Sequence, residues 1–145
     1  MTTITFKIIG HGSHEYKKCA SLREEILRKP LGLAFTCEEL EKEKAHIHIG
    51  GYIEDELCAT AMLVPQEQRV KMQRVAVRKD LQGKGIASAM MKFCEAYASE
   101  KGFKEIYCHA RETAIPFYKK NQYLPEGEPF IETTIPHLKM RKLIK

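Results

Sequence analysis

Residues 75–88 read Val75-Ala76-Val77-Arg78-Lys79-Asp80-Leu81-Gln82-Gly83-Lys84-Gly85-Ile86-Ala87-Ser88. The apolar run at 75–77 predicts the end of a strand, and a glycine turn then leads into an apolar helix. Amide groups in the first turn of a helix have no internal acceptor, so they attract anions. The two glycines would let phosphate oxygens come close to the backbone. The stretch therefore predicts a phosphate-binding turn between a strand and a helix.

The helix after this turn is predicted over residues 84–101. Ile86, Met90 and Cys94 recur every four positions and would share one face, and Gly102 is a typical stop. Two other phosphate motifs do not fit the stretch. Lys84 is followed by glycine where a nucleotide P-loop needs Ser or Thr, and two mid-chain glycines are too few for the dinucleotide fingerprint.

Three segments resemble the GNAT N-acetyltransferase superfamily. The pattern Gln82-x-x-Gly85-x-Ala87 is similar to the motif with which that family binds the pyrophosphate of acetyl-CoA. Residues 114–120, which include Phe117-Tyr118, and residues 135–140, Ile-Pro-His-Leu-Lys-Met, look like the glyphosate N-acetyltransferase-like and ElaA-like branch. The resemblance implies acetyl-CoA as the acyl donor, with these cofactor-binding residues: Val75, Ala76, Val77, Gln82, Gly83, Lys84, Gly85, Ile86, Ala87 and Ser88.

The expected fold is α/β, with one central mixed sheet flanked by helices in a single domain over residues 1–145. Strands are predicted near 3–9, 45–53, 56–64, 69–78, 104–109, 123–130 and 135–143. Helices are predicted at 14–29, closed by Pro30, at 84–101 and at 113–121. The strand–helix–strand order over 69–109 predicts a parallel pair, and the short links among the middle strands predict antiparallel pairs. The resemblance implies that the strands beside the cofactor helix splay apart.

Composition favours a globular cytoplasmic protein. The chain has 145 residues, is 43% hydrophobic, has apolar runs too short for a membrane helix and starts without a secretory pattern. Five cysteines without a Cys-x-x-Cys pair predict reduced thiols, and Cys94 and Cys108 are expected in the core. The net charge is +5, but lysines and acids alternate at 38–44, which predicts a solvated face and no nucleic-acid partner.

His137 and Tyr118 are the candidate catalytic residues for acetyl transfer to an amine. An imidazole, with an ordinary pKa near 6.5, can take a proton at neutral pH, so His137 is proposed as the base. A phenol, with an ordinary pKa of about 10, can give a proton to the leaving thiolate, so Tyr118 is proposed as the acid. We expect Phe117 to pack inward and Tyr118 to face the groove. Without the resemblance, both candidates would be structural residues of a sheet and a helix.

Three arginines suggest an anionic acceptor. Arg74 interrupts an apolar strand, Arg111 follows the end of another strand, and Arg23 lies on the first helix. A guanidinium binds carboxylate or phosphate groups with two parallel hydrogen bonds, and the resemblance to glyphosate N-acetyltransferase assigns all three to substrate binding. The alternative is that each arginine pairs with a local acid such as Glu25 or Glu112.

The sequence favours an enzyme that acetylates a small, anionic amine by direct attack, working as a monomer or homodimer. Two alternatives stay open: acetylation of a protein or peptide amine, and a non-catalytic acyl-CoA-binding module. His46 and His48 share a strand face, but no further ligand has metal spacing, so no metal is expected.

Overall fold

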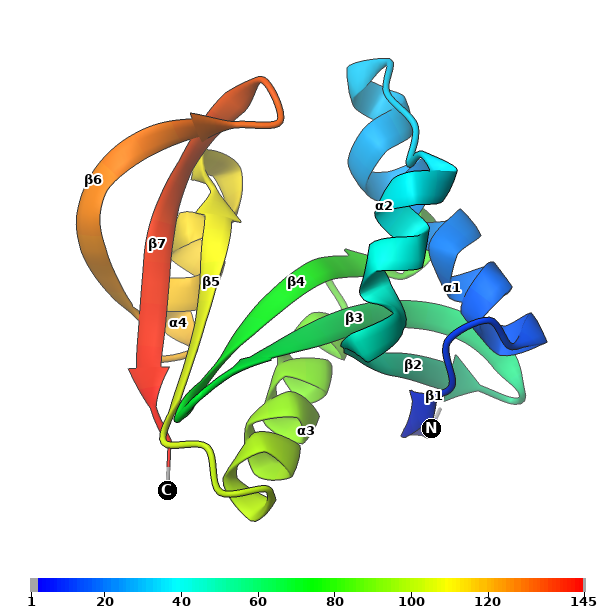
Figure 1. The fold of residues 1–145 in the computed structure, drawn as a ribbon, viewed down its shortest axis with the longest axis horizontal. Coiled ribbons are helices and arrows are strands. Elements are labelled where there is room, and N and C mark those ends of the chain that lie inside the picture. Colours follow the sequence, from blue (N-terminus) through cyan, green and yellow to red (C-terminus); the bar gives the residue numbers. More distant parts are fainter. Residues whose placement is uncertain (1–2, 145) are drawn as a thin grey trace. The chain divides into compact units, whose positions relative to one another are not determined.

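The computed structural model describes residues 3–144. Seven strands form one mixed sheet in the order β1-β2-β3-β4-β5-β7-β6, which confirms the predicted fold class (Figure 1). The strands are β1 Ile4–Ile9, β2 Ile47–Ile53, β3 Glu56–Gln66, β4 Arg69–Val77, β5 Glu105–Arg111, β6 Leu124–Glu132 and β7 Ile135–Leu143.

The strand pairings agree with the predicted ones. β2 is antiparallel to both β1 and β3. β4 and β5 are parallel, and their pairing joins Arg69–Lys71 to Glu105–Tyr107. β7 lies between β5 and β6 and is antiparallel to both. The parallel pair requires a crossover, which the helix α3 provides (Ile86–Glu100).

The first helix is shorter than predicted and does not end at Pro30. The α-helix α1 covers His14–Arg23 and continues as a π-helical turn, Glu24–Arg28, and a 3-10 turn, Lys29–Leu31. Pro30 lies inside the 3-10 turn, where proline is tolerated because the first amides of a helix need no acceptor. Gly32, with φ of 72°, ends the segment in the left-handed conformation.

A second helix, which we did not predict, is α2 (Cys37–Glu41), followed by a 3-10 turn, Lys42–Ala45. Thr36 and Glu39 start it with a capping box, in which each side chain accepts a hydrogen bond from the other residue's amide. The last helix, α4 (Ile115–Lys120), follows a 3-10 turn at Glu112–Ala114.

The chain divides into two compact units. Unit 1 comprises Met1–Val64 and Arg74–Cys94. Within it, α1 packs against Ile9 of β1 through Tyr16 and Cys19, whereas α3 packs against Phe6 through Phe93, with ring centroids 5.6 Å apart. Because Phe6 and Ile9 point to opposite faces of β1, the two helices cover opposite faces of the strands in unit 1.

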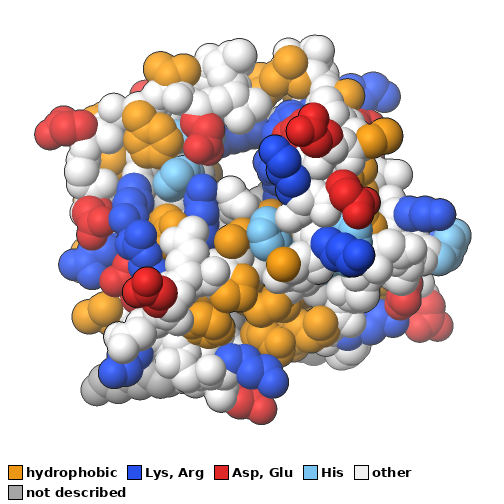
Figure 2. All heavy atoms as spheres, in the orientation of Figure 1, with side chains coloured by type: hydrophobic (Ala, Val, Ile, Leu, Met, Phe, Trp, Pro, Cys, Tyr) orange, Lys and Arg blue, Asp and Glu red, His pale blue; other side chains and the backbone are white. Residues whose placement is uncertain are grey.

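Unit 2 comprises Pro65–Gln73 and Glu95–Lys145. The helix α4 contacts β5 and β7, and Tyr118, Cys108 and Met140 are buried on this side. Side chains of both charges are interspersed over β6 and β7 on the face seen in Figure 2.

All five cysteines are free thiols, and four of them are buried, including Cys94 and Cys108 as predicted. Cys37, in the first turn of α2, is exposed. Among residues 3–144, every helix is too short or too polar to cross a bilayer.

Candidate active site

The glycine turn of unit 1 is open to a ligand. Gly83 and Gly85 have φ angles of 80° and 83°, a conformation that residues with side chains rarely adopt. A Cβ atom added to either glycine would meet nothing within 4 Å. Helix α3 starts here, because the amide of Ala89 donates to the carbonyl of Gly85 at 3.1 Å. The amides of residues 86–88 therefore lack an intrahelical acceptor, which suits an anion site.

Side chains around this turn fix its shape. Nε2 of Gln82 donates to the carbonyl of Val77 at 3.0 Å, which ties the turn to the end of β4. Nε of Arg78 donates to Asp80 at 2.7 Å, whereas Lys84 is exposed. A cavity of about 630 Å³ adjoins the turn, and Lys84 contributes to its lining. Gln82 thus supports the backbone of the turn, and Lys84 is placed to meet an anion.

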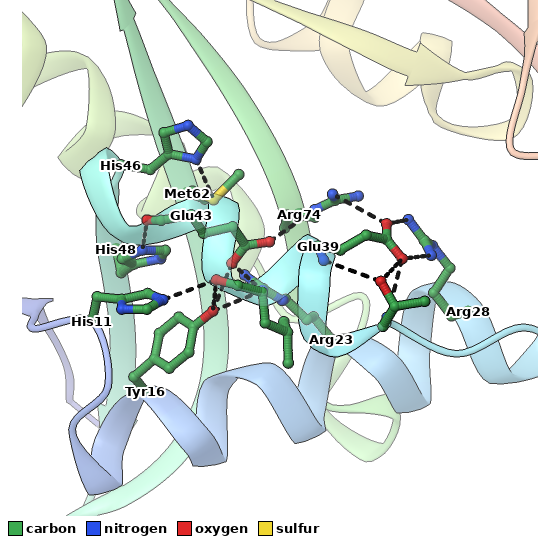
Figure 3. Close-up of polar contacts among 12 residues, drawn as sticks. His11, Tyr16, Arg23, Arg28, Glu39, Glu43, His46, His48, Met62 and Arg74 are labelled. Atoms are coloured by element: carbon green, nitrogen blue, oxygen red, sulfur yellow. Dashed lines mark hydrogen bonds and ion pairs between the residues drawn. The ribbon is translucent and has the colours of Figure 1, made fainter.

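A buried ion pair joins α1 to the segment after α2 (Figure 3). Nη2 of Arg23 contacts Oε1 of Glu43, and these side chains are only 1% and 2% exposed. The hydroxyl of Tyr16 donates to the same oxygen at 2.9 Å, and burial together with this bond raises the pKa of Tyr16 to about 12. The solvated face predicted for residues 38–44 was therefore wrong at Glu43. Arg23 is paired with this glutamate rather than with its neighbour Glu25.

Two more arginines gather beside this pair. The guanidinium carbons of Arg74 and Arg28 lie 4.8 and 4.1 Å from the ring centroid of Phe35. Nε of Arg74 is 3.5 Å from Oε2 of Glu43, and Nη2 of Arg28 donates to Oε2 of Glu39 at 3.0 Å. This arginine cluster has three cations and two carboxylates, and so a net formal charge of +1: Arg23, Arg28, Arg74, Glu39 and Glu43.

The backbone of β4 is irregular at Arg74, and this changes the direction in which the Arg74 side chain points. Its φ angle is 55°, in the left-handed region, although it lies inside β4. Such a residue interrupts the regular alternation of side chains along a strand. Burial lowers the pKa of Arg74, and the charge of Glu43 opposes this effect. Unit 1 therefore brings together two of the three predicted substrate residues, Arg23 and Arg74.

The other predicted acceptor residue and the candidate base lie opposite each other in unit 2. Arg111 of β5 is the register partner of His137 in β7. Nδ1 of His137 is 2.9 Å from the carbonyl of Ile135, and 5% of the residue is exposed. A carbonyl can only accept, so Nδ1 carries the proton of the neutral ring and Nε2 has the free lone pair. His137 thus has the tautomer that a base requires at Nε2.

Glu132 faces His137 from β6. Its Oε2 is 3.8 Å from Nε2 of His137, and its Oε1 is 2.9 Å from Nδ1 of His109 on β5. Phe130 packs beside both rings, with centroids 4.9 Å from His109 and 6.0 Å from His137. These four residues form a compact group on one face of β5, β7 and β6, and we call it the histidine group. The sequence analysis did not identify Glu132 or His109.

Tyr118 lies on the opposite face of β5. It is 7% exposed in α4, and its ring centroid is 5.5 Å from that of Tyr123. Burial raises the pKa of the Cys108 thiol to about 12, although a hydrogen bond from Tyr118 opposes the rise. Since Cys108 and His109 alternate along β5, the two candidate catalytic side chains flank this strand from its two faces. Phe117, expected to be the inward residue, is only half-buried.

His46 and His48 have structural contacts in unit 1. Nδ1 of His46 is 3.3 Å from the sulfur of Met62, and Nε2 of His48 is 2.9 Å from the carbonyl of Glu43. Burial lowers the pKa of both imidazoles. Within residues 3–144, no three side chains of the metal-binding types are arranged to hold an ion.

Comparison with known proteins gives the family. Residues 13–123 match the acetyltransferase (GNAT) family. The chain belongs to this family. Over 139 residues it is 30% identical to the uncharacterized N-acetyltransferase YjcF of Bacillus subtilis. The matched region covers 93% of this chain and 97% of YjcF. This GNAT protein is accordingly an acetyl-CoA-dependent N-acetyltransferase, as predicted.

Solved structures show the same fold. Escherichia coli ElaA superposes with a TM-score of 0.82 at 21% identity, covering 97% of this chain and 99% of ElaA. A GNAT family acetyltransferase of Elizabethkingia anophelis, determined with acetyl-CoA bound, superposes with a TM-score of 0.77 at 15% identity, covering 97% and 98% of the two chains. At these identities the two likenesses show the fold.

The glycine turn has the features that a pyrophosphate needs. Gly83 and Gly85 leave open space beside their backbone, and the first three amides of α3 have no acceptor within the helix. The pairing of β4 with β5 covers only Arg69–Lys71, so Val75–Val77 lies beyond it and could pair with an amide-containing arm. When bound, acetyl-CoA supplies a thioester whose acetyl group can be transferred.

Proposed function

We propose that this GNAT protein acetylates the amine of a small anionic molecule. The observation that carries the proposal is the arginine cluster, whose five side chains have a net formal charge of +1. Arg23 is already neutralised by a buried glutamate, so the spare positive charge belongs to Arg74 and Arg28. A ligand with one carboxylate or phosphate group would complete the charge balance of the cluster.

His137 and Tyr118 would handle the protons of the reaction. The amine nitrogen attacks the thioester carbonyl, a carbon–nitrogen bond forms and the carbon–sulfur bond breaks. Nε2 of His137 takes the proton that the amine loses, and its bonded Nδ1 supports this role. The hydroxyl of Tyr118 gives a proton to the leaving thiolate, because a phenol stays protonated at neutral pH and can donate to a thiolate. Direct attack needs no covalent acyl-enzyme.

The glycine turn gives a first test, with a matched control. Gly85→Ala would place a methyl group in the proposed phosphate site and strain a backbone with φ of 83°. Gly12→Ala causes the same strain, because Gly12 has φ of 80° and equally open surroundings. Both variants should lose about 1 kcal/mol of unfolding free energy. Calorimetry with coenzyme A should show at least tenfold weaker binding for Gly85→Ala alone, about 1.4 kcal/mol.

Equal binding by the two variants, or no binding by the folded wild type, would refute the phosphate site. Release of free thiol from acetyl-CoA should then be measured across amino acids, aminophosphonates, polyamines, aminoglycosides and peptides. An acidic amine should give the highest kcat/KM. A preference for polyamines or peptides would refute the anionic acceptor, and binding without turnover of any amine would favour a CoA-binding module.

A further inference from the structure

Glu132 contacts two histidines that come from two different strands. Its Oε1 accepts a hydrogen bond from Nδ1 of His109 on β5, at 2.9 Å. Its Oε2 is 3.8 Å from Nε2 of His137 on β7. Glu132 is the last residue of β6 and pairs with Ile135 across the turn, so the strand register holds its carboxylate near both rings. One carboxylate is therefore shared by two imidazoles within the histidine group.

The hydrogen bonds assign the protons of this group. A carboxylate oxygen can only accept, so Nδ1 of His109 carries a proton. Nδ1 of His137 is held in the same way by the carbonyl of Ile135, at 2.9 Å. With a lone pair on Nε2, neutral His137 has nothing to donate to Glu132, which is consistent with the 3.8 Å gap. Once Nε2 takes up a proton, the same two atoms become a charge pair.

The surroundings keep Glu132 ionised. Burial raises the pKa of Glu132, but the hydrogen bond from His109 and the nearby charge of Lys71 lower it, and the pKa lies below the ordinary value. Arg111 also faces His137 from β5 as its register partner. Phe130 packs on both imidazoles. A carboxylate in this setting can stabilise a cation beside it.

We propose that Glu132 is a positioning residue that strengthens His137 as the base and that His109 holds Glu132 in place. The inference rests on the proposed function. When the amine proton moves to Nε2 of His137, the resulting imidazolium is paired with the Glu132 carboxylate, and the proton later leaves to solvent. Glu132 gains no proton in this step. His109 fixes the orientation of the carboxylate through Oε1 and leaves Oε2 for His137.

Glu132→Gln tests this role, because the amide oxygen of glutamine can still accept from His109 while the charge is lost. A nearby carboxylate favours protonated imidazole, so without it His137 should lose its proton at lower pH. The acidic limb of the kcat/KM profile should therefore move down by about 0.5–1 pH unit, and kcat at the plateau should fall about tenfold. The KM for acetyl-CoA should stay within about twofold.

Glu126→Gln is the matched control. Glu126 lies on the same strand and the same face as Glu132, where it binds Lys139 at 2.8 Å and Arg141 at 2.8 Å. It is not part of the histidine group, so the same substitution should leave the pH profile and kcat unchanged. Identical profiles for Glu132→Gln and the wild type, or equal shifts in both variants, would overturn the positioning role.

A measurement without turnover separates this inference from the proposed function. Long-range proton–nitrogen spectra of the wild type should show neutral His109 and His137 as Nδ1–H tautomers. In Glu132→Gln, the titration midpoint of the His137 ring should fall by about 0.5–1 pH unit. An Nε2–H tautomer of His137 or an unmoved midpoint would overturn the inference. If the midpoint moves but no amine is acetylated, the inferred coupling stands and the proposed function fails.

Discussion

The two candidate catalytic residues, Tyr118 and His137, lie on opposite faces of β5. Tyr118 is buried in α4, where it opposes the rise that burial causes in the pKa of the Cys108 thiol, while His137 belongs to the histidine group on the other face of the sheet. In the proposed reaction they serve different atoms, because His137 takes the proton of the attacking amine and Tyr118 protonates the leaving sulfur.

Tyr118→Phe should lower kcat by about 100-fold at saturating acetyl-CoA, because the thiolate would leave without a proton donor. The KM for acetyl-CoA should change less than threefold. Tyr107→Phe is the control, since it removes a buried hydroxyl that donates to Gln66 at 2.6 Å in the same unit. Equal losses of kcat in the two folded variants would show that Tyr118 acts through packing and not through proton transfer.

The helix that carries Tyr118 ends in a strained cap. Gln122 has φ of 68°, and the amide of Tyr123 donates to the carbonyl of Tyr118 at 2.9 Å, while the amide of Gln122 donates to Lys119 at 3.0 Å. These two bonds are those of a Schellman motif, in which glycine is the usual residue at the left-handed position. The cap therefore forms although the side chain of Gln122 disfavours the left-handed backbone.

Gln122→Gly should raise the free energy of unfolding by about 0.5–1 kcal/mol, because the left-handed backbone costs glycine nothing. Urea denaturation would measure the change. Glu100→Gly is the comparison, because α3 already has glycine at the left-handed position of its own cap, Gly102. The substitution places a further glycine in the last turn of α3 and should destabilise the protein. A Gln122→Gly variant less stable than the wild type would contradict this account.

Secondary-structure elements were predictable where local patterns determine them, and less so where long-range pairing does. The 3.6-residue period of α3 and the glycine turn before it were clear from residues 75–102. The helix α2 was missed, although Thr36-x-x-Glu39 is a capping signal, because its short, charged sequence has no apolar stripe. The burial of Glu43 has no local signal at all, since it depends on Arg23, twenty residues away.

In the candidate site, too, some residues were predictable from local motifs and others depend on long-range strand pairing. His137 and Tyr118 were identified by resemblance to a family motif, whereas Glu132 and His109 meet only because β6 and β5 both lie near the same part of β7. Strand order and register are properties of the folded sheet, and a single sequence does not encode them in any short pattern. The arginines were recognised, but the carboxylates that set their net charge were not.

Buried tyrosines make the stability of the whole protein sensitive to high pH. Burial and the hydrogen bond to Glu43 raise the pKa of Tyr16 to about 12, and burial beside Glu95 raises the pKa of Tyr123 as well. In the unfolded chain a tyrosine ionises near pH 10. Between pH 10 and 12 the unfolded state loses protons that the folded state keeps, so the stability present below pH 10 is lost as the pH rises.

From pH 9 to pH 11, wild-type protein should lose about 1 kcal/mol more unfolding free energy than Tyr16→Phe, which lacks the titrating hydroxyl. At pH 8 the variant should be about 1–2 kcal/mol less stable than the wild type, because Glu43 loses a hydrogen bond. Urea denaturation at the three pH values measures both effects. Parallel pH dependence of the two proteins would rule out Tyr16 as a source of alkaline sensitivity.

The exposed thiol of Cys37 has a practical consequence. Coloured disulfide reagents that report released coenzyme A also react with accessible protein thiols, and in the folded chain four of the five cysteines are shielded. A kinetic trace should therefore begin with a background equivalent to one thiol per molecule. Cys37→Ser would remove this background, and Cys37 itself offers a selective attachment point for a fluorophore near the arginine cluster of unit 1.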